Sequence, residues 1–171
     1  VGSMDFADVD GERRLYNGSL LFDGGKEPVA SYHKRHLVPF GEYVPLPGLL
    51  RFLSPLDVDF AAGESVTVFK VEGLAPFGAL ICFEDTMGLL ARDVVRGGAR
   101  WLVNQTNDAW FDPSVQSEQH LAHAVFRCVE NRVPMVRSCN TGVTAIIDAY
   151  GRVERRLEPR QSGFLVGTVQ I

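Results

Sequence analysis

Cys82 stands where an apolar segment ends and a helical pattern begins. Residues 77–82 are apolar, and Phe83-Glu84-Asp85-Thr86 leads from them into a helical pattern over 87–97. The sequence therefore predicts a strand-to-helix turn at Cys82. Such a turn exposes a side chain at the carboxyl edge of a sheet, and it directs backbone N–H groups toward that side chain. These dipoles stabilise a thiolate and a developing oxyanion, so the position suits a cysteine nucleophile.

Lys34 is the second candidate, because it follows the apolar segment 29–33 instead of lying in a solvated run of charges. A partly buried ammonium needs an acidic partner, and Glu42 can supply one if the intervening loop folds back. A cation fixed in this way would hold Cys82 as a thiolate and stabilise an oxyanion. The alternative for His33-Lys34-Arg35-His36 is a solvated basic surface.

The other thiols and the histidines carry weaker signals. Cys82, Cys128 and Cys139 are an odd number without CxxC spacing, which argues against a disulfide framework and a zinc cluster. Cys128 falls on the apolar face of a predicted helix, so we expect it in the core. Core filling is also the expectation for Cys139, with lining of the pocket at a strand end as the alternative. His120 and His123 have no third ligand nearby, so neither a metal site nor a cofactor is expected.

Short apolar segments alternate with turn signals along the whole chain and predict a mixed α/β or α+β fold. Helices are expected over 87–97, closed by a Gly-Gly pair, and over 117–132, opened by Ser117. Ala149-Tyr150-Gly151-Arg152 is a hairpin signal between two late strands. Strands are predicted at 15–22, 29–33, 66–71, 77–82, 101–104, 135–138, 143–148 and 164–169.

Composition narrows the class of protein. The 171 residues are 46% hydrophobic and 22% charged, as in an ordinary globular domain. The net charge is −4 and the basic residues are scattered, so nucleic acid is not an expected partner. The longest uncharged apolar run, 73–83, is far shorter than the roughly 20 residues of a membrane-spanning helix. We expect one domain that does not itself cross a bilayer.

Three motifs carry a resemblance to a known family. They are the stretch from Lys34 to Pro45, the pentad Ile81-Cys82-Phe83-Glu84-Asp85 and the segment from Leu102 to Phe111. In order and spacing they resemble the apolipoprotein N-acyltransferases of the nitrilase superfamily. The nitrilases in general share only the Lys and Cys-x-Glu elements, whereas the Pro-Phe-Gly-Glu-Tyr-Val-Pro loop and Thr-Asn-Asp-Ala-Trp-Phe are particular to the acyltransferase branch. The resemblance covers almost the whole chain.

The resemblance implies an α-β-β-α sandwich with a Glu-Lys-Cys triad. By motif, Cys82 is the nucleophile and Lys34 the triad lysine, while Glu42 orients the lysine and Glu84 is a further acidic site residue. The triad glutamate is not visible in the chain. We therefore expect residues 1–171 to be a partial carbon-nitrogen hydrolase domain, here an incomplete sandwich, without its N-terminal part and the flanking membrane helices.

Contacts with the substrate are implied for Asn17, Phe83, Trp110 and Phe111. Trp110 and Phe111 fall in a predicted loop, where an exposed pair would touch acyl chains or the bilayer interface, and core filling is the alternative. Phe83 replaces a Tyr, and His33 an Asp, that the family often has. The hydrogen bonds of those side chains are therefore expected to be changed or lost.

The implied reaction is an acyl transfer in two steps, from a phospholipid to Cys82 and then to the N-terminal amine of a diacylglyceryl-cysteine apolipoprotein. The native enzyme would lie in the bacterial inner membrane with this domain in the periplasm. One alternative is a soluble nitrilase-type amidohydrolase that uses the same Lys34 and Cys82. The other is a non-catalytic fragment, because a chain without its general base would lose most activity.

Overall fold

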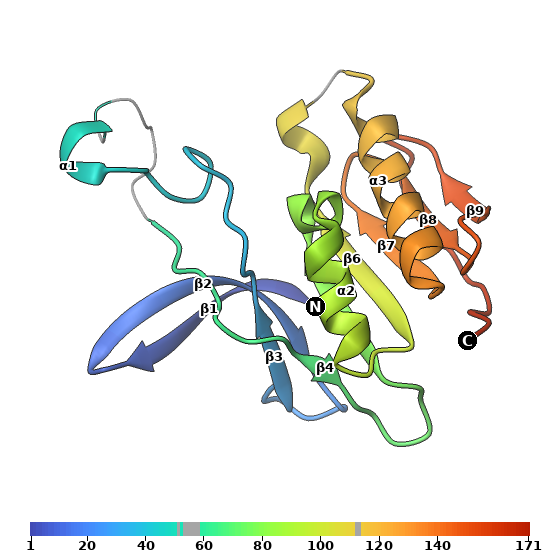
Figure 1. The fold of residues 1–171 in the computed structure, drawn as a ribbon, viewed down its shortest axis with the longest axis horizontal. Helices are drawn as coiled ribbons and strands as arrows, with labels where there is room; N and C mark the ends of the chain where they lie inside the picture. Colours follow the sequence, from blue (N-terminus) through green and yellow to red (C-terminus); the bar gives the residue numbers. More distant parts are fainter. Residues whose placement is uncertain (51, 53–58, 112–113) are drawn as a thin grey trace. The chain divides into compact units, whose positions relative to one another are not determined.

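The computed structural model describes residues 1–50, 52, 59–111 and 114–171, and leaves the side chains of Pro47 and Phe111 undescribed. The chain forms two compact units, Val1–Ser65 and Val66–Ile171. Figure 1 shows the elements of both units in the order of the chain. The strands are β1 (Gly2–Val9), β2 (Glu12–Leu21), β3 (Ala30–His33), β4 (Val68–Phe69), β5 (Phe77–Ile81), β6 (Trp101–Thr106), β7 (Met135–Cys139), β8 (Thr144–Ile147) and β9 (Val153–Leu157). The helices are α1 (Pro47–Leu50), α2 (Gly88–Arg96) and α3 (Gln116–Asn131), with 3-10 turns η2 (Cys82–Thr86) and η3 (Asp108–Phe111).

The first unit is built on an antiparallel sheet with the strand order β1-β2-β3. Its buried aromatic residues are Tyr16 on β2 and Tyr32 on β3. Asp10 and Gly11 connect β1 to β2, and both have positive φ, as in a two-residue hairpin of type I′. This Asp-Gly pair is a hairpin signal in the sequence, yet no strand over residues 2–9 was predicted. Burial alternates along β1, but no side chain is fully buried and the large apolar residues Met4 and Phe6 lie on its exposed side, so the sequence lacks a clear strand pattern.

The second unit contains a sheet with the strand order β4-β5-β6-β7-β8-β9. Strands β5, β6 and β7 are parallel, and the outer strands pair antiparallel. The helices α2 and α3 form the two crossovers between the parallel strands, and they lie side by side on one face of the sheet (Figure 1). The core fills the space between this face and the helices, with Leu80, Leu102 and Met135 fully buried on the strands and Ala91, Val94 and Cys128 on the helices. The mixed α/β prediction is confirmed.

Two glycines permit the close packing of α2. A Cβ placed on Gly78 of β5 would come within 1.9 Å of the Val94 Cγ1 atom, so only glycine lets the helix approach the strand this closely. At the other end, Gly98 follows the helix with φ of +108°, and its N–H donates to the carbonyl of Val95. The Gly-Gly pair therefore ends α2 as its sequence predicted.

Three local predictions need correction. No strand includes residues 164–169: Phe164 is 84% exposed, and the segment joins no ladder in the described part of the chain. Aromatic and β-branched residues suit a strand, but a strand also requires a neighbour that accepts and donates its backbone hydrogen bonds. The helix α3 begins at Gln116, so Ser117 lies inside it, and its N-cap residue Val115 provides no side-chain hydrogen bond. Strand β4 is confined to Val68–Phe69 within the predicted 66–71.

The predicted late hairpin is confirmed. The Asp148 N–H donates to the Arg152 carbonyl, and Gly151 takes a φ of +82° in the turn that joins β8 to β9.

None of the helices in the described residues has the length and apolar character needed to cross a membrane.

Candidate active site

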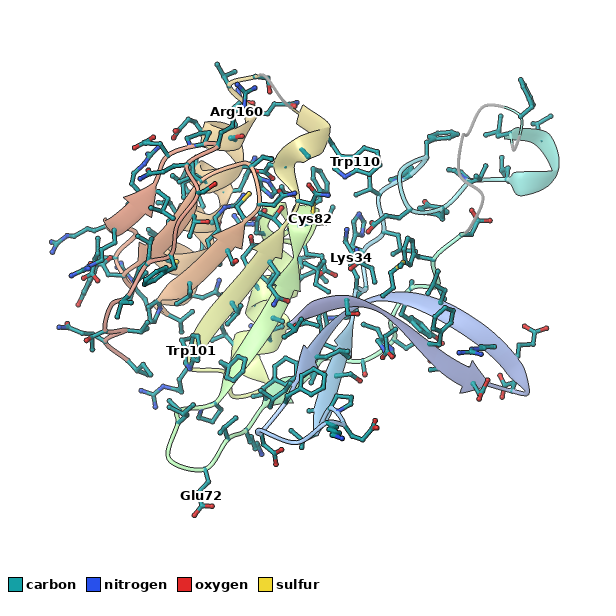
Figure 2. The ribbon with its side chains drawn as sticks, turned by 180° about the vertical axis from the view of Figure 1, so that it is seen from behind. Lys34, Glu72, Cys82, Trp101, Trp110 and Arg160 are labelled. Atoms are coloured by element: carbon teal, nitrogen blue, oxygen red, sulfur yellow. The ribbon has the colours of Figure 1, made fainter. Side chains whose placement is uncertain are left out.

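Cys82 begins η2 directly after β5 (Figure 2). It is half-buried and has a φ of +51°, in the left-handed region. For a residue with a Cβ this conformation costs about 1–2 kcal/mol, and it persists only where surrounding contacts hold it. The predicted strand-to-helix turn at Cys82 is therefore confirmed. The change from strand to 3-10 turn takes place at Cys82 itself, because its left-handed backbone conformation ends the extended strand.

Glu84 fixes this turn from inside. The carboxylate is fully buried, and its Oε2 atom accepts the backbone N–H of Ile81 at 2.8 Å. The Glu84 carbonyl accepts the N–H of Met87 at 3.0 Å, which closes the same turn toward α2. Glu84 thus holds the backbone on both sides of Cys82, and a direct part in the chemistry stays a prediction.

A row of side chains crosses the sheet under the turn. The parallel register places Leu80 of β5 opposite Asn104 of β6, and Asn104 opposite Arg137 of β7. This row faces the helices, because Leu80 belongs to the core cluster that packs against them. Asn104 and Arg137 are both fully buried. Two buried polar side chains therefore lie next to each other on β6 and β7, in register with Leu80 near the carboxyl end of β5.

Four ionisable side chains surround this row, and we call Asp85, Asp108, His120 and Arg137 the charge cluster. The His120 ring forms ion pairs with Asp85 through Nε2 at 2.7 Å and with Asp108 through Nδ1 at 2.8 Å. Arg137 forms ion pairs with the same carboxylates, at 2.5 Å to Asp85 and 3.3 Å to Asp108. Two carboxylates thus face two cations, and the buried cluster is neutral as a whole when His120 is protonated.

Burial and charge act in opposite directions on these groups. Burial alone would lower the pKa of His120, but its hydrogen bonds to Asp108 and Asp85 and the negative charge of Asp85 raise that pKa to about 9. Burial alone would raise the pKa of Asp108, but the His120 hydrogen bond and the charges of His120 and Arg137 leave it below its usual value. His120 is therefore an imidazolium at neutral pH, with protons on both ring nitrogens.

Sequence reasoning did not assign these four residues to a site. Arg137 lies within an otherwise buried strand segment, and Asp85 and Asp108 each follow a parallel strand. Charged residues at such positions were the signal that could have identified them.

Lys34 follows β3 in the first unit (Figure 2). It is 1% exposed, and its Nζ donates to the Oε2 atom of Glu42 at 2.6 Å. The same Oε2 accepts the N–H of Val38 at 2.8 Å, so the loop folds back onto the lysine. The predicted ion pair is confirmed, and the alternative of a solvated basic surface is wrong for Lys34.

Asn17 and His33 also have defined partners. The Asn17 amide donates to the other carboxylate oxygen of Glu42 at 2.7 Å, so Asn17 orients the acid that holds Lys34. Its predicted contact with substrate stays a prediction. His33 stacks on Tyr16 at 4.1 Å between ring centroids and lies 2.7 Å from the Asp5 carboxylate. The change in hydrogen bonding expected from a His in place of the family's Asp stays a prediction.

The remaining predicted residues lie in varied surroundings. Phe83 is 39% exposed beside Cys82, and Trp110 is 71% exposed on η3, which excludes core filling for Trp110 (Figure 2). The side chain of Phe111 lies outside the described residues. Cys128 is fully buried, and burial raises the pKa of its thiol to about 12, so its assignment to the core is confirmed. Cys139 is half-buried, with a pKa raised by burial and by the charge of Asp108.

Comparison with known proteins decides the family. The model of the carbon-nitrogen hydrolases matches residues 1–171. The chain belongs to the carbon-nitrogen hydrolase family. Among its relatives in this family, the apolipoprotein N-acyltransferase of Geobacter metallireducens is 43% identical over 100% of the chain, and apolipoprotein N-acyltransferase 1 of Treponema denticola is 37% identical over 98%. The resemblance inferred from the motifs is confirmed. The chain spans 33% and 32% of the length of these two relatives, or about a third.

Two solved structures show the same fold. Nit3 of Saccharomyces cerevisiae, a nitrilase-superfamily member, superposes with a TM-score of 0.71 at 19% identity, over 95% of this chain and 56% of that one. The glutamine-dependent NAD+ synthetase of Acinetobacter baumannii gives 0.70 at 12% identity, over 94% of this chain and 29% of that one. At such identities the likeness concerns the fold, and it confirms the nitrilase-like fold class.

Proposed function

We propose that the chain is the catalytic part of an apolipoprotein N-acyltransferase with Cys82 as its nucleophile. The observation that carries this proposal is the left-handed turn at Cys82, held by the buried Glu84 at the carboxyl end of β5. The names of the relatives support the reaction class, because the matches to these relatives extend over nearly the whole of this chain. Residues 1–171 then form part of one catalytic domain in a longer enzyme.

In the first step the Cys82 thiolate attacks an ester carbonyl of a phospholipid. A C–S bond forms, the ester C–O bond breaks, and the alkoxide takes a proton and leaves as a lysophospholipid. Lys34, which is paired with Glu42, stabilises the oxyanion of the tetrahedral intermediate. The resemblance to the family requires a further glutamate, outside the three motifs that carry the resemblance, to accept the proton of the Cys82 thiol. Such a positioned base contributes about 10²–10⁴-fold.

In the second step the N-terminal amine of a diacylglyceryl-cysteine apolipoprotein attacks the thioester. An amide bond forms, the C–S bond breaks, and Cys82 is regenerated with a proton from the amine. Both the acyl donor and the product are lipids, so we place the enzyme in the inner membrane with this domain in the periplasm. The exposed Trp110 is then suited to contact acyl chains, and we propose the same for Phe83 and Phe111.

The test is an acyl-enzyme measurement on the complete gene product in detergent with phosphatidylethanolamine. We expect an intact-mass increase of one acyl chain that hydroxylamine removes and that Cys82→Ser abolishes. Cys128→Ala is the matched control, because this buried thiol packs in the core and should leave the adduct intact. Absence of an adduct together with hydrolysis of a small amide would overturn the proposal in favour of an amidohydrolase.

A further inference from the structure

The backbone carbonyl of Cys82 faces two side-chain donors that the acyl-transfer chemistry does not use. Asn104 Nδ2 lies 3.4 Å from this oxygen, and His120 Nε2 also lies 3.4 Å from it. Asn104 comes from β6 and His120 from α3, so two separate elements converge on one carbonyl. That carbonyl belongs to a residue whose φ of +51° needs outside support.

We propose that His120 is a positioning residue for the nucleophile: its imidazolium, held between Asp85 and Asp108, fixes the Cys82 carbonyl and thereby the turn that presents the thiol. This inference rests on the proposed function only in taking Cys82 as the nucleophile. It does not depend on which acyl donor or acceptor the enzyme uses.

The surroundings of His120 make its charge essential to this role. The charged groups that face the ring are Asp85 from η2, Asp108 from η3 and Arg137 from β7. With both nitrogens protonated, Nδ1 donates to Asp108 while the Nε2 proton is available to Asp85 and to the Cys82 carbonyl. A neutral ring keeps only one N–H. The lone pair of its other nitrogen would then point at a carboxylate, and the hydrogen bond at that nitrogen would be lost.

Loss of that proton has two consequences for Cys82. The carbonyl loses one of its donors, which weakens the hold on the left-handed turn. The charge cluster also changes from neutral to a net charge of −1 beneath the thiol, which disfavours a thiolate. Both effects lower the reactivity of Cys82 at alkaline pH, where a thiol without such a neighbour would become more reactive. The pKa of His120, about 9, places the change in that range.

The experiment measures alkylation of Cys82 by iodoacetamide in the complete gene product, with peptide mass spectrometry as the readout. No acyl donor is needed, so the result is independent of whether acyl transfer occurs. We expect His120→Gln to slow alkylation of Cys82 by roughly fivefold, the rate equivalent of one hydrogen bond. His123→Gln is the matched control, because this exposed histidine lies on the same helix and should leave the rate unchanged.

Cys128 reports on the fold in the same samples, since its buried thiol stays unlabelled while the core is intact. If His120→Gln keeps Cys128 protected and Cys82 reacts at the wild-type rate, the proposal is overturned.

The pH profile keeps the proposal testable if His120→Gln does not fold. In the wild type, alkylation of Cys82 should rise with pH and then decline above about pH 9. Asp85→Asn preserves the shape of the side chain but removes one of the two carboxylates that keep the ring charged, so the decline should move to lower pH. A wild-type profile without an alkaline decline, or a decline that Asp85→Asn leaves in place, would overturn the positioning role. If the charge cluster only stabilised the fold, Asp85→Asn would not move the alkaline decline of Cys82 alkylation to another pH.

Discussion

Lys34 shows how a single buried charge is accommodated. Its ammonium is withdrawn from water and reaches the Glu42 carboxylate at 2.6 Å, while Asn17 and the Val38 N–H occupy further acceptor sites of the same carboxylate. A buried ion pair is tolerated only when such additional hydrogen bonds compensate for desolvation. The three contacts therefore compensate for the burial of the ion pair and fix the direction of the Lys34 side chain.

Glu42→Gln tests this arrangement at the level of one residue. The change leaves the shape intact but places the buried lysine against a neutral amide, so we expect the free energy of unfolding to fall by about 3 kcal/mol. Glu12→Gln on the exposed part of β2 is the matched control and should shift it by less than about 0.5 kcal/mol. Thermal unfolding of the protein measures both. Equal stability of the two variants would show that the pair is not needed to hold Lys34.

At the scale of elements, the crossover from β5 through α2 to β6 sets the position of Cys82. Gly78 lets α2 approach the strand, and η2 connects the two with Cys82 as its first residue. The turn geometry thus depends on how closely helix and strand pack. A change in this packing would move the ends of the turn even without a contact to Cys82.

Gly78→Ala tests the packing of α2 on β5. The added methyl would overlap the Val94 Cγ1 atom, so we expect a loss of about 1–3 kcal/mol in stability. Combining it with Val94→Ala removes the clash, and the double variant should lose less than the sum of the two single changes. Gly48→Ala, where a Cβ meets nothing within 4 Å, is the control. Strict additivity of the double variant would contradict the close approach.

At the scale of the whole molecule, the charge cluster connects elements that are distant in sequence. Asp85 and Arg137 are 52 residues apart, and Asp108 and His120 belong to η3 and α3. Each carboxylate is shared between a histidine and an arginine. A pH change that titrates one member of the charge cluster is therefore expected to affect the contacts between η2, η3, α3 and β7 together.

The pH dependence of stability follows from the raised pKa of His120. A group whose pKa rises on folding, here from 6.5 to about 9, contributes stability that is complete below pH 6.5 and lost as pH rises through about 9. The shift corresponds to about 3 kcal/mol. We expect wild-type stability to fall between these pH values, and the difference from His120→Gln to shrink with it. On the acid side the lowered pKa of Asp108 has the opposite sign, so its contribution is lost as pH falls. Urea unfolding at a series of pH values measures both, and a flat alkaline side would contradict the assignment of His120.

Features that depend on neighbours in the chain could be predicted from the sequence. Apolar periodicity, residue type and short spacing were enough to predict four of them. These are the turn at Cys82, the Lys34–Glu42 pair, the buried Cys128 and the ends of α2. The motifs also predicted the family correctly. Local propensity and side-chain chemistry act over a few residues, so they are readable without a fold.

Features that depend on which elements become neighbours were decided by the tertiary structure. Residues 164–169 are rich in apolar and β-branched residues but join no ladder among the described residues, whereas β1, which was not predicted, pairs along its whole length with β2. The charge cluster could not be assembled from sequence, because its carboxylates and cations come from η2, η3, α3 and β7. Backbone pairing and buried ion pairs are contacts between distant segments, and no local pattern encodes their partners.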